Sequence, residues 1–173
     1  MKHAILPAAV LIAASGCGII TVVQQPFEPM RIAAKRPPPA PPRVVLTPSS
    51  IQINEKIQFA FDSADILPVS HGLLGEIGSV LKENPQIELM QVAGHTDITG
   101  KADYNRKLSQ RRAESVRDFL VRYGFDKKRF ACEGFGPDRP IADNATDEGK
   151  EKNRRVEFNI LKQGPKKTLV QDP

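Results

Sequence analysis

The sequence predicts an α+β domain, a two-layer sandwich in the order β-α-β-α-β-loop-β, with helices on one face of a small mixed sheet. Two stretches carry apolar residues at helical spacing, and short apolar stretches of strand length lie before, between and after them. Helices that alternate with strands in this way favour a sheet covered by helices. The chain has 173 residues, of which 40% are apolar, which is enough for one modest core.

The first predicted elements begin at residue 51. Apolar residues predict strands there, with an interruption near Asn54-Glu55; these residues are Ile51, Ile53, Ile57 and Phe59. Ser70 is a candidate N-cap for the first helix. One face of that helix carries Leu73, Leu74, Ile77, Val80 and Leu81. Asn84-Pro85 ends the helix, and residues 87–92 have the length and composition of a strand.

The second half of the domain repeats this alternation. A helix is predicted from about Asp103 to Tyr123, with Gly124 as its stop. Its buried face carries Leu108, Val116, Phe119, Leu120 and Tyr123. Residues 130–133 form a third strand and residues 134–143 a turn-rich loop. Apolar and polar residues then alternate from Arg155 to Ile160, which predicts the last strand.

The basic character of the chain does not belong to this domain. The whole chain carries 25 Lys and Arg against 20 Asp and Glu, a formal net charge of +5. Residues 51–161, however, contain 17 basic and 18 acidic side chains. Because the excess positive charge lies in the flanking segments, nucleic-acid binding by the folded part loses its main support.

The N-terminus has the layout of an export signal. Residues 1–16 combine a charged start, an apolar run and small residues, and Cys17 follows directly. The segment from Leu11 to Cys17 resembles a bacterial lipobox, in which a signal peptidase cuts before the cysteine and the cysteine receives lipid. Ala14 departs from the larger aliphatic residue usual at its position. Gly18, in place of Asp, favours the outer membrane by resemblance to lipoprotein sorting in enterobacteria.

Between this signal and the domain we expect a linker. Residues 17–50 contain the run from Pro37 to Pro42, which favours an extended polyproline II spacer. The domain is expected at 51–161, and a basic disordered tail at 162–173. The chain has two cysteines, so Cys132 has no partner if Cys17 is lipidated. We interpret Cys132 as a small buried hydrophobic residue rather than a reactive thiol.

One charged residue lies on the apolar stripe of the second helix. Arg112 falls between Leu108 and Val116 on that stripe, and a buried guanidinium needs an anion or ligand oxygens as partner. A side chain that extends its charged end into water is the alternative. Asp97 is its natural complement, in a glycine-flanked loop after a predicted strand, although a turn-stabilising role is equally compatible with its spacing. No metal-ligand spacing, nucleophile elbow or phosphate-binding loop is present, so we predict no enzyme, cofactor or metal site.

Four motifs together resemble a known family, the OmpA-like peptidoglycan-binding domain. They are Gly94-His95-Thr96-Asp97-x-x-Gly100, Tyr104-Asn105-x-x-Leu108-Ser109-x-x-Arg112-Ala113, Gly134-Phe135-Gly136 and Asn153-Arg154-Arg155-Val156-Glu157-Phe158. The motifs occur in the family's order across residues 51–161. With the lipobox, the whole chain resembles peptidoglycan-associated outer-membrane lipoproteins.

The resemblance implies a binding site and a cellular role. By motif position, Asp97 and Arg112 bind the diaminopimelate of peptidoglycan stem peptides, and Thr99 and Asn105 help to hold it. It also implies an outer-membrane, lipid-anchored protein whose domain faces the periplasm and ties the membrane to the wall. Asn153-Arg154-Arg155 is either an anion site or the sequence that fixes the loop before the last strand, and we favour the loop role. Two alternatives remain: a wall-anchoring subunit of a larger envelope complex such as a secretion system, and a wall-cleaving enzyme.

Overall fold

The computed structural model describes residues 41–165, which contain one open five-stranded sheet. Its strands are β1 (Val44–Leu46), β2 (Ser50–Ile53), β3 (Ile87–His95), β4 (Phe130–Gly136) and β5 (Val156–Gln163). They lie in the order β1-β2-β5-β3-β4. β3 and β4 are parallel, and every other neighbouring pair is antiparallel. The predicted mixed sheet is confirmed.

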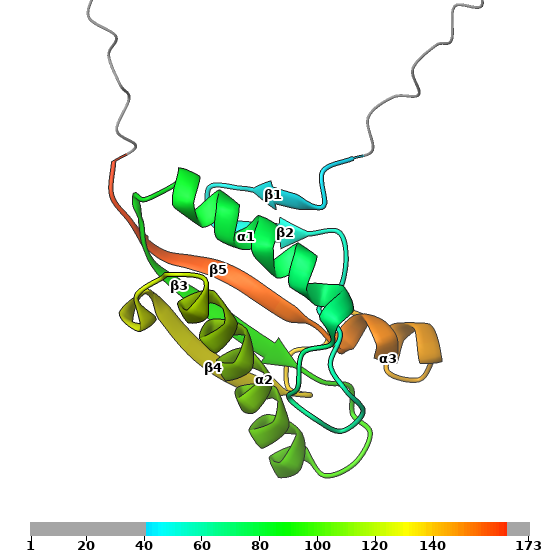
Figure 1. Cartoon of the computed structure of the whole chain (residues 1–173). Helices are drawn as coiled ribbons and strands as arrows, with labels where there is room; N and C mark the ends of the chain where they lie inside the picture. Colours follow the sequence, from blue (N-terminus) through cyan, green and yellow to red (C-terminus); the bar gives the residue numbers. More distant parts are fainter. Residues whose placement is uncertain (1–40, 166–173) are drawn as a thin grey trace, which may run out of the picture. The chain divides into compact units, whose positions relative to one another are not determined.

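The helices complete the two layers. Helices α1 (His71–Glu83) and α2 (Ala102–Arg122) lie side by side on one face of the sheet, whereas the short α3 (Asp147–Asn153) lies beyond it, where β5 begins (Figure 1). Two 3₁₀ turns, Pro68–Ser70 and Lys127–Arg129, precede α1 and β4. The predicted α+β class, with the two long helices on one face, is therefore confirmed.

The core lies between these helices and the sheet. The predicted apolar faces of both helices point into it, except at Tyr123, which caps the end of α2 and is 41% exposed. The most deeply buried members of the core include Leu74, Ile77, Val92, Ala113, Val116 and Leu120. Ser70 does stand at the N-cap of α1, but its hydroxyl accepts a hydrogen bond from the backbone of Gln58 at 2.8 Å rather than from the helix. This bond fixes the segment that leads from β2 to α1.

Helix α2 lies unusually close to β3 and β4 because glycines replace side chains at the contact. A Cβ atom on Gly94 would lie 2.2 Å from the carbonyl oxygen of Ser109, and one on Gly134 would lie 2.3 Å from the amide of Gln110. The Gln110 side chain donates to Cys132 O and accepts from Gly134 N, at 3.3 and 2.8 Å. Two backbone groups at the outer edge of β4 thus find hydrogen-bond partners in the adjacent helix.

The structure differs from the predicted elements in several places. Strand β1 lies in the range assigned to the linker, and β5 continues two residues past 161. Phe59 forms only one isolated bridge, with Ile66. Strand β4 extends through Gly136, and α3 was not predicted. The last difference matters for function, because α3 and the start of β5 border the candidate site.

Candidate functional site

The loop that follows β3 carries the first predicted site residues. Asn105, near the start of α2, donates from Nδ2 to the carbonyl oxygens of Thr99 and Asp97, at 2.9 and 3.3 Å. The backbone amide of Thr96 donates to Gly136 O at 2.9 Å and ties the loop to the end of β4. Asn105 is buried, so its side chain braces the loop from below. Thr99 is exposed on the loop.

Asp97 is a buried, ionised carboxylate in this loop. Its Oδ1 accepts a hydrogen bond from the backbone of Thr99 at 2.7 Å, and its Oδ2 pairs with Nη1 of Arg154. Burial acts to raise the pKa of Asp97, but the Thr99 amide and the Arg154 guanidinium outweigh it and hold the pKa below the ordinary value. Asp97 therefore carries a full negative charge at neutral pH.

Arg112 lies where its place on the apolar stripe predicts. The side chain is half-buried, its Nε donates to Ser63 O at 2.9 Å, and the guanidinium stands over the ring of Phe59 at 5.0 Å. Within residues 41–165 its two terminal nitrogens make no hydrogen bond. Burial lowers the pKa of Arg112 and outweighs the opposing effect of the Asp62 carboxylate, while the nearby Arg154 adds to the lowering. The terminal nitrogens of this guanidinium can therefore bind an anionic partner.

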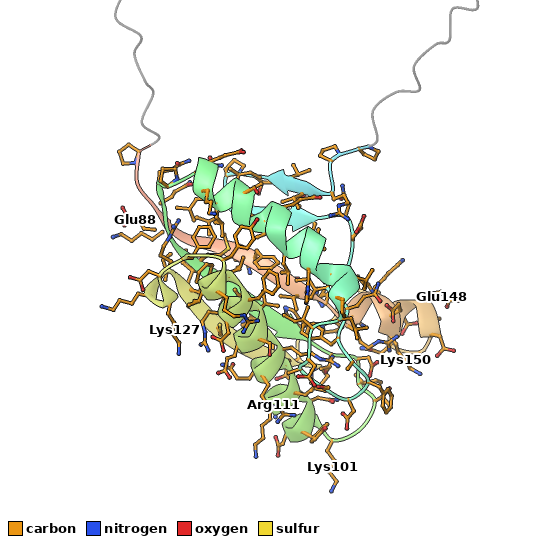
Figure 2. The ribbon with its side chains drawn as sticks, in the orientation of Figure 1. Glu88, Lys101, Arg111, Lys127, Glu148 and Lys150 are labelled. Atoms are coloured by element: carbon orange, nitrogen blue, oxygen red, sulfur yellow. The ribbon has the colours of Figure 1, made fainter. Side chains whose placement is uncertain are left out.

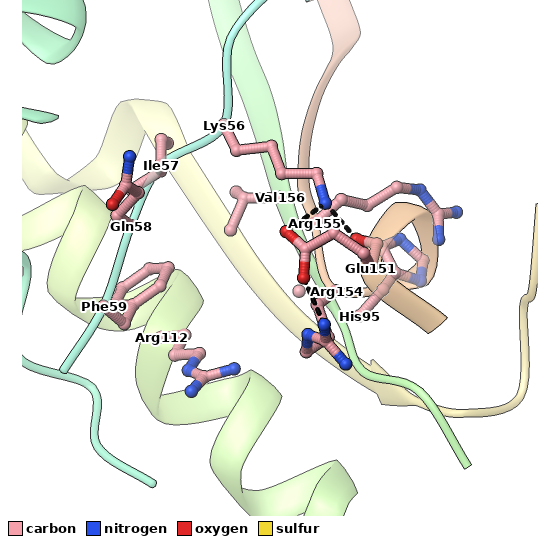
Figure 3. A pocket seen from close by; sticks show the side chains of 11 residues that line it. Lys56, Ile57, Gln58, Phe59, His95, Arg112, Glu151, Arg154, Arg155 and Val156 are labelled. Atoms are coloured by element: carbon pink, nitrogen blue, oxygen red, sulfur yellow. Dashed lines mark hydrogen bonds and ion pairs between the residues drawn. The ribbon is translucent and has the colours of Figure 1, made fainter. Parts of the chain in front are cut away.

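A cavity of about 390 Å³ joins Arg112 to the start of β5 (Figure 3). Lys56 and Arg154 line it and both pair with Glu151, which projects from α3. The distance from Lys56 Nζ to Glu151 Oε1 is 2.7 Å. Asp97 is not part of the lining but lies behind Arg154. The cavity is therefore mainly cationic, with Glu151 as its only lining carboxylate among the described residues.

The structure thus connects Asp97 and Arg112 through a third residue. Asp97 makes no hydrogen bond or ion pair with Arg112; Arg154 pairs with Asp97 and shares the cavity with Arg112. The favoured loop role is correct for the neighbouring Asn153, which is fully buried and binds the backbone of Ile141 and Ala142 through Oδ1 at 2.8 and 3.1 Å. Arg154 itself, however, points to the cavity side.

Sequence reasoning missed Lys56 and Glu151 altogether. Their side chains meet although the two residues are 95 positions apart, and no spacing rule connects them. The predicted lipidation site, Cys17, lies outside the described residues. Within residues 41–165, no group of three His, Cys, Asp or Glu side chains is placed to hold a metal ion.

His95, which belongs to the first family motif, and Cys132 are both at least partly buried. His95 is buried, its ring stacks on Phe135 at 5.4 Å, and neither ring nitrogen makes a hydrogen bond to the described residues. Cys132 is half-buried, and burial raises the pKa of its thiol, which agrees with an unreactive packing role. None of the helices in the described part is both long enough and apolar enough to cross a bilayer.

Comparison with known proteins gives one matching family model, the OmpA family, over residues 58–154. The probable lipoprotein YiaD of Escherichia coli K12 is 41% identical over 110 residues, which are 64% of this chain and 50% of that protein. The chain thus spans half the length of this relative.

Two solved structures share the fold. The cell wall anchor of the type VI secretion system (T6SS) from Pseudomonas aeruginosa matches with a TM-score of 0.60 and 32% identity, over 70% of this chain and 89% of that one. The peptidoglycan-associated lipoprotein from Burkholderia pseudomallei matches with a TM-score of 0.55 and 29% identity, over 61% of this chain and 89% of that one. Both matches extend over nearly the whole of the smaller solved chain.

Proposed function

The chain belongs to the OmpA family, and on this premise we propose that it is a non-enzymatic outer-membrane lipoprotein that binds peptidoglycan without a covalent bond. Diaminopimelate in the stem peptides is the group recognised, and binding ties the membrane to the cell wall. The observation that carries this proposal is an ionised Asp97 and a half-buried Arg112 whose terminal nitrogens make no hydrogen bond within residues 41–165.

Diaminopimelate suits this pair because its side chain ends in an ammonium and a carboxylate. A carboxylate has about four acceptor positions, so Asp97 can accept from the ammonium while it keeps its bonds to Thr99 and Arg154. The free nitrogens of Arg112 can grip the ligand carboxylate in two-point fashion. A lysine side chain lacks that carboxylate and would leave Arg112 unpaired, which is the basis of discrimination.

Thr99 and Asn105 act mainly on the shape of the site. Asn105 holds the loop carbonyls, and the backbone of Thr99 orients the Asp97 carboxylate. The exposed Thr99 side chain is available to the ligand. We therefore assign Asn105 a positioning role and Thr99 a peripheral contact.

Modest affinity at such a site is sufficient for a tether. Each charge-assisted contact contributes about 1.5–3 kcal/mol. An N-terminal lipid on Cys17 would hold the domain beside the wall at high local concentration. One acyl chain anchors a protein only marginally, and lipoproteins of this type generally carry more than one.

A second role has support of its own. The similarity to the wall anchor of a secretion system favours a subunit that fastens a larger envelope complex to the wall. The same binding site would serve both roles, and they differ in the protein partners, which co-purification from membranes would identify.

Sedimentation with insoluble wall sacculi tests the site directly. We expect the full-length protein to pellet with sacculi and free diaminopimelate to release it. Asp97→Asn and Arg112→Ala should each weaken binding by about tenfold or more, since each removes one charge-assisted contact. The matched control is Lys127→Gln, an exposed residue at the far end of the domain from α3 (Figure 2). Equal pelleting of the site variants and the wild type would refute the assignment.

The anchor has a separate test. Radiolabelled palmitate should enter the wild-type protein in growing cells and fail to enter Cys17→Ser. Label that persists in the variant would refute lipidation at Cys17. Release of soluble wall fragments by the purified protein would instead favour the enzyme alternative.

A further inference from the structure

The cavity beside Arg112 has a mainly cationic lining, of which the proposed function uses only part. Lys56, Arg112 and Arg154 line it, and Glu151 is the only carboxylate among the described residues of the lining. Outside the lining, Asp97 pairs with Arg154, and the Asp62 carboxylate acts on Arg112. Arg155 also lines the cavity, but it is already paired with Glu157 at 2.7 Å.

Binding of diaminopimelate alone leaves part of this lining without a ligand group. Its ammonium and carboxylate are assigned to Asp97 and Arg112, so neither meets the wall formed by Lys56 and Arg154. Within the lining, these two cations share one carboxylate, Glu151. A ligand carboxylate beside them would be a second anion and would make charge-assisted contacts, which favours anion binding at this wall.

The position of Arg154 makes it the residue to receive that anion. It lines the same cavity as Arg112, and the two guanidiniums lie near enough for Arg154 to act on the pKa of Arg112. Its Nη1 and Nη2 pair with Asp97 and Glu151, whereas its Nε makes no hydrogen bond within residues 41–165. Lys56 reaches the same wall from the segment after β2 (Figure 3).

We infer that this wall, Lys56 and Arg154, is a second carboxylate subsite, which selects stem peptides carrying a free carboxylate in addition to that of the diaminopimelate side chain. The inference rests on the proposed function. Two groups of a stem peptide have this chemistry: the α-carboxylate of the γ-linked glutamate that precedes diaminopimelate, and the carboxylate at the peptide terminus. Amidation of the group that is bound would remove the charge.

Calorimetric titration of the full-length protein with three synthetic tripeptides tests the inference. All contain alanine, γ-linked D-glutamate and diaminopimelate with a free side-chain carboxylate. The first has both other carboxylates free, the second is amidated on glutamate and the third at the terminus. We expect one amide to bind about tenfold more weakly than the free acid and the other to bind equally, which also identifies the group.

Variants test whether Lys56 and Arg154 cause the preference for the free acid over the amide. Lys56→Gln and Arg154→Gln should bring the ratio of amide to acid dissociation constants close to one, and Lys127→Gln should leave it unchanged. Lys56 does not contact Asp97, so its variant separates the subsite from the diaminopimelate pair. If Arg154→Gln does not fold, Arg154→Lys replaces it and should retain part of the ratio.

The outcomes separate the two proposals. If both amides bind as tightly as the free acid, the second subsite is refuted and the proposed function stands. A preference that persists in Lys56→Gln and Arg154→Gln refutes these residues as its source. If none of the peptides binds, or a lysine-containing tripeptide binds as well as the free acid, the proposed function fails and the inference fails with it.

Discussion

At the scale of single residues, Glu157 is a carboxyl group whose pKa is strongly lowered. His95 Nε2 lies 3.6 Å from its Oε2, and Arg155 donates to its Oε1 at 2.7 Å. The His95 ring and the Arg155 guanidinium lower the pKa of Glu157 to about 2, against the opposing effect of burial. A carboxyl whose pKa is lower in the folded state stabilises the fold above the unfolded-state pKa, and this contribution is lost as pH falls towards the folded-state value.

The lowered pKa of Glu157 gives a prediction for acid unfolding. Between pH 5.5 and pH 2.5 the free energy of unfolding should fall, and Glu157→Gln should reduce that fall by about 1–2 kcal/mol, a figure discounted because the side chain is more than a third exposed. Urea titrations at the two pH values measure it. Glu83→Gln, an exposed glutamate at the end of α1, is the control and should follow the wild type. An unchanged pH dependence in Glu157→Gln would show that the ion pairs do not persist in solution.

The sequence predicted the partial burial of Arg112 but not the partner of Asp97. The spacing from Leu108 to Val116 placed Arg112 on the buried stripe, and it is half-buried. The pairing of Asp97 with Arg154 joins residues 57 positions apart, and only the meeting of β3 and β5 in the sheet brings them together. Local periodicity carries no information about such a contact. The binding roles of Asp97, Arg112, Thr99 and Asn105 remain predictions.

At the scale of secondary structure, the contact of α2 with the sheet depends on Gly94. Gly94→Ala would place a methyl group 2.2 Å from the carbonyl oxygen of Ser109, in backbone that cannot move freely. We expect a loss of about 2–3 kcal/mol in unfolding free energy, measured by chemical denaturation. Gly75→Ala is the matched control, because its nearest neighbour is at 3.6 Å and alanine favours a helix by about 1 kcal/mol over glycine. Equal stability of the two variants would contradict the close contact.

The sequence did not predict α3 and β1, and the reason is the same for both. Helix α3 has the sequence DEGKEKN, which has no apolar face, and tertiary contacts hold it in place. Thr146 caps it by accepting from Gly149 N at 3.0 Å, and the buried Asn153 ends it. Strand β1 has only three residues and follows a proline-rich segment. Elements that bury little apolar surface of their own leave no periodic pattern.

At the scale of the whole molecule, β1 places the start of the stable domain before residue 51, the position at which the sequence predicted it. A fragment of residues 51–161 lacks β1, which pairs with β2 and contributes Val44 to the edge of the core. It should unfold at lower urea concentration than a fragment of residues 41–165, with a loss of about 2–4 kcal/mol. A fragment of residues 43–165 keeps β1 and should stay within about 1 kcal/mol of the longer one. Equal stability of the shortest and longest fragments would mean that β1 is dispensable.

Arg43 ties the N-terminal side of the β1–β2 hairpin to helix α1. Its guanidinium binds Glu76 of α1, with Nη2 at 2.5 Å from Oε1, and Glu55 at 3.2 Å, just before β1 begins. Val44 pairs with Ile53 at the open end of the β1–β2 hairpin, so tension applied to the chain from its N-terminal side would peel the strands apart one pair at a time. Such a pull first meets the hydrogen bond from Asn54 Nδ2 to Pro42 O and then the ion pairs of Arg43, which transmit part of the force to α1 before the strands separate.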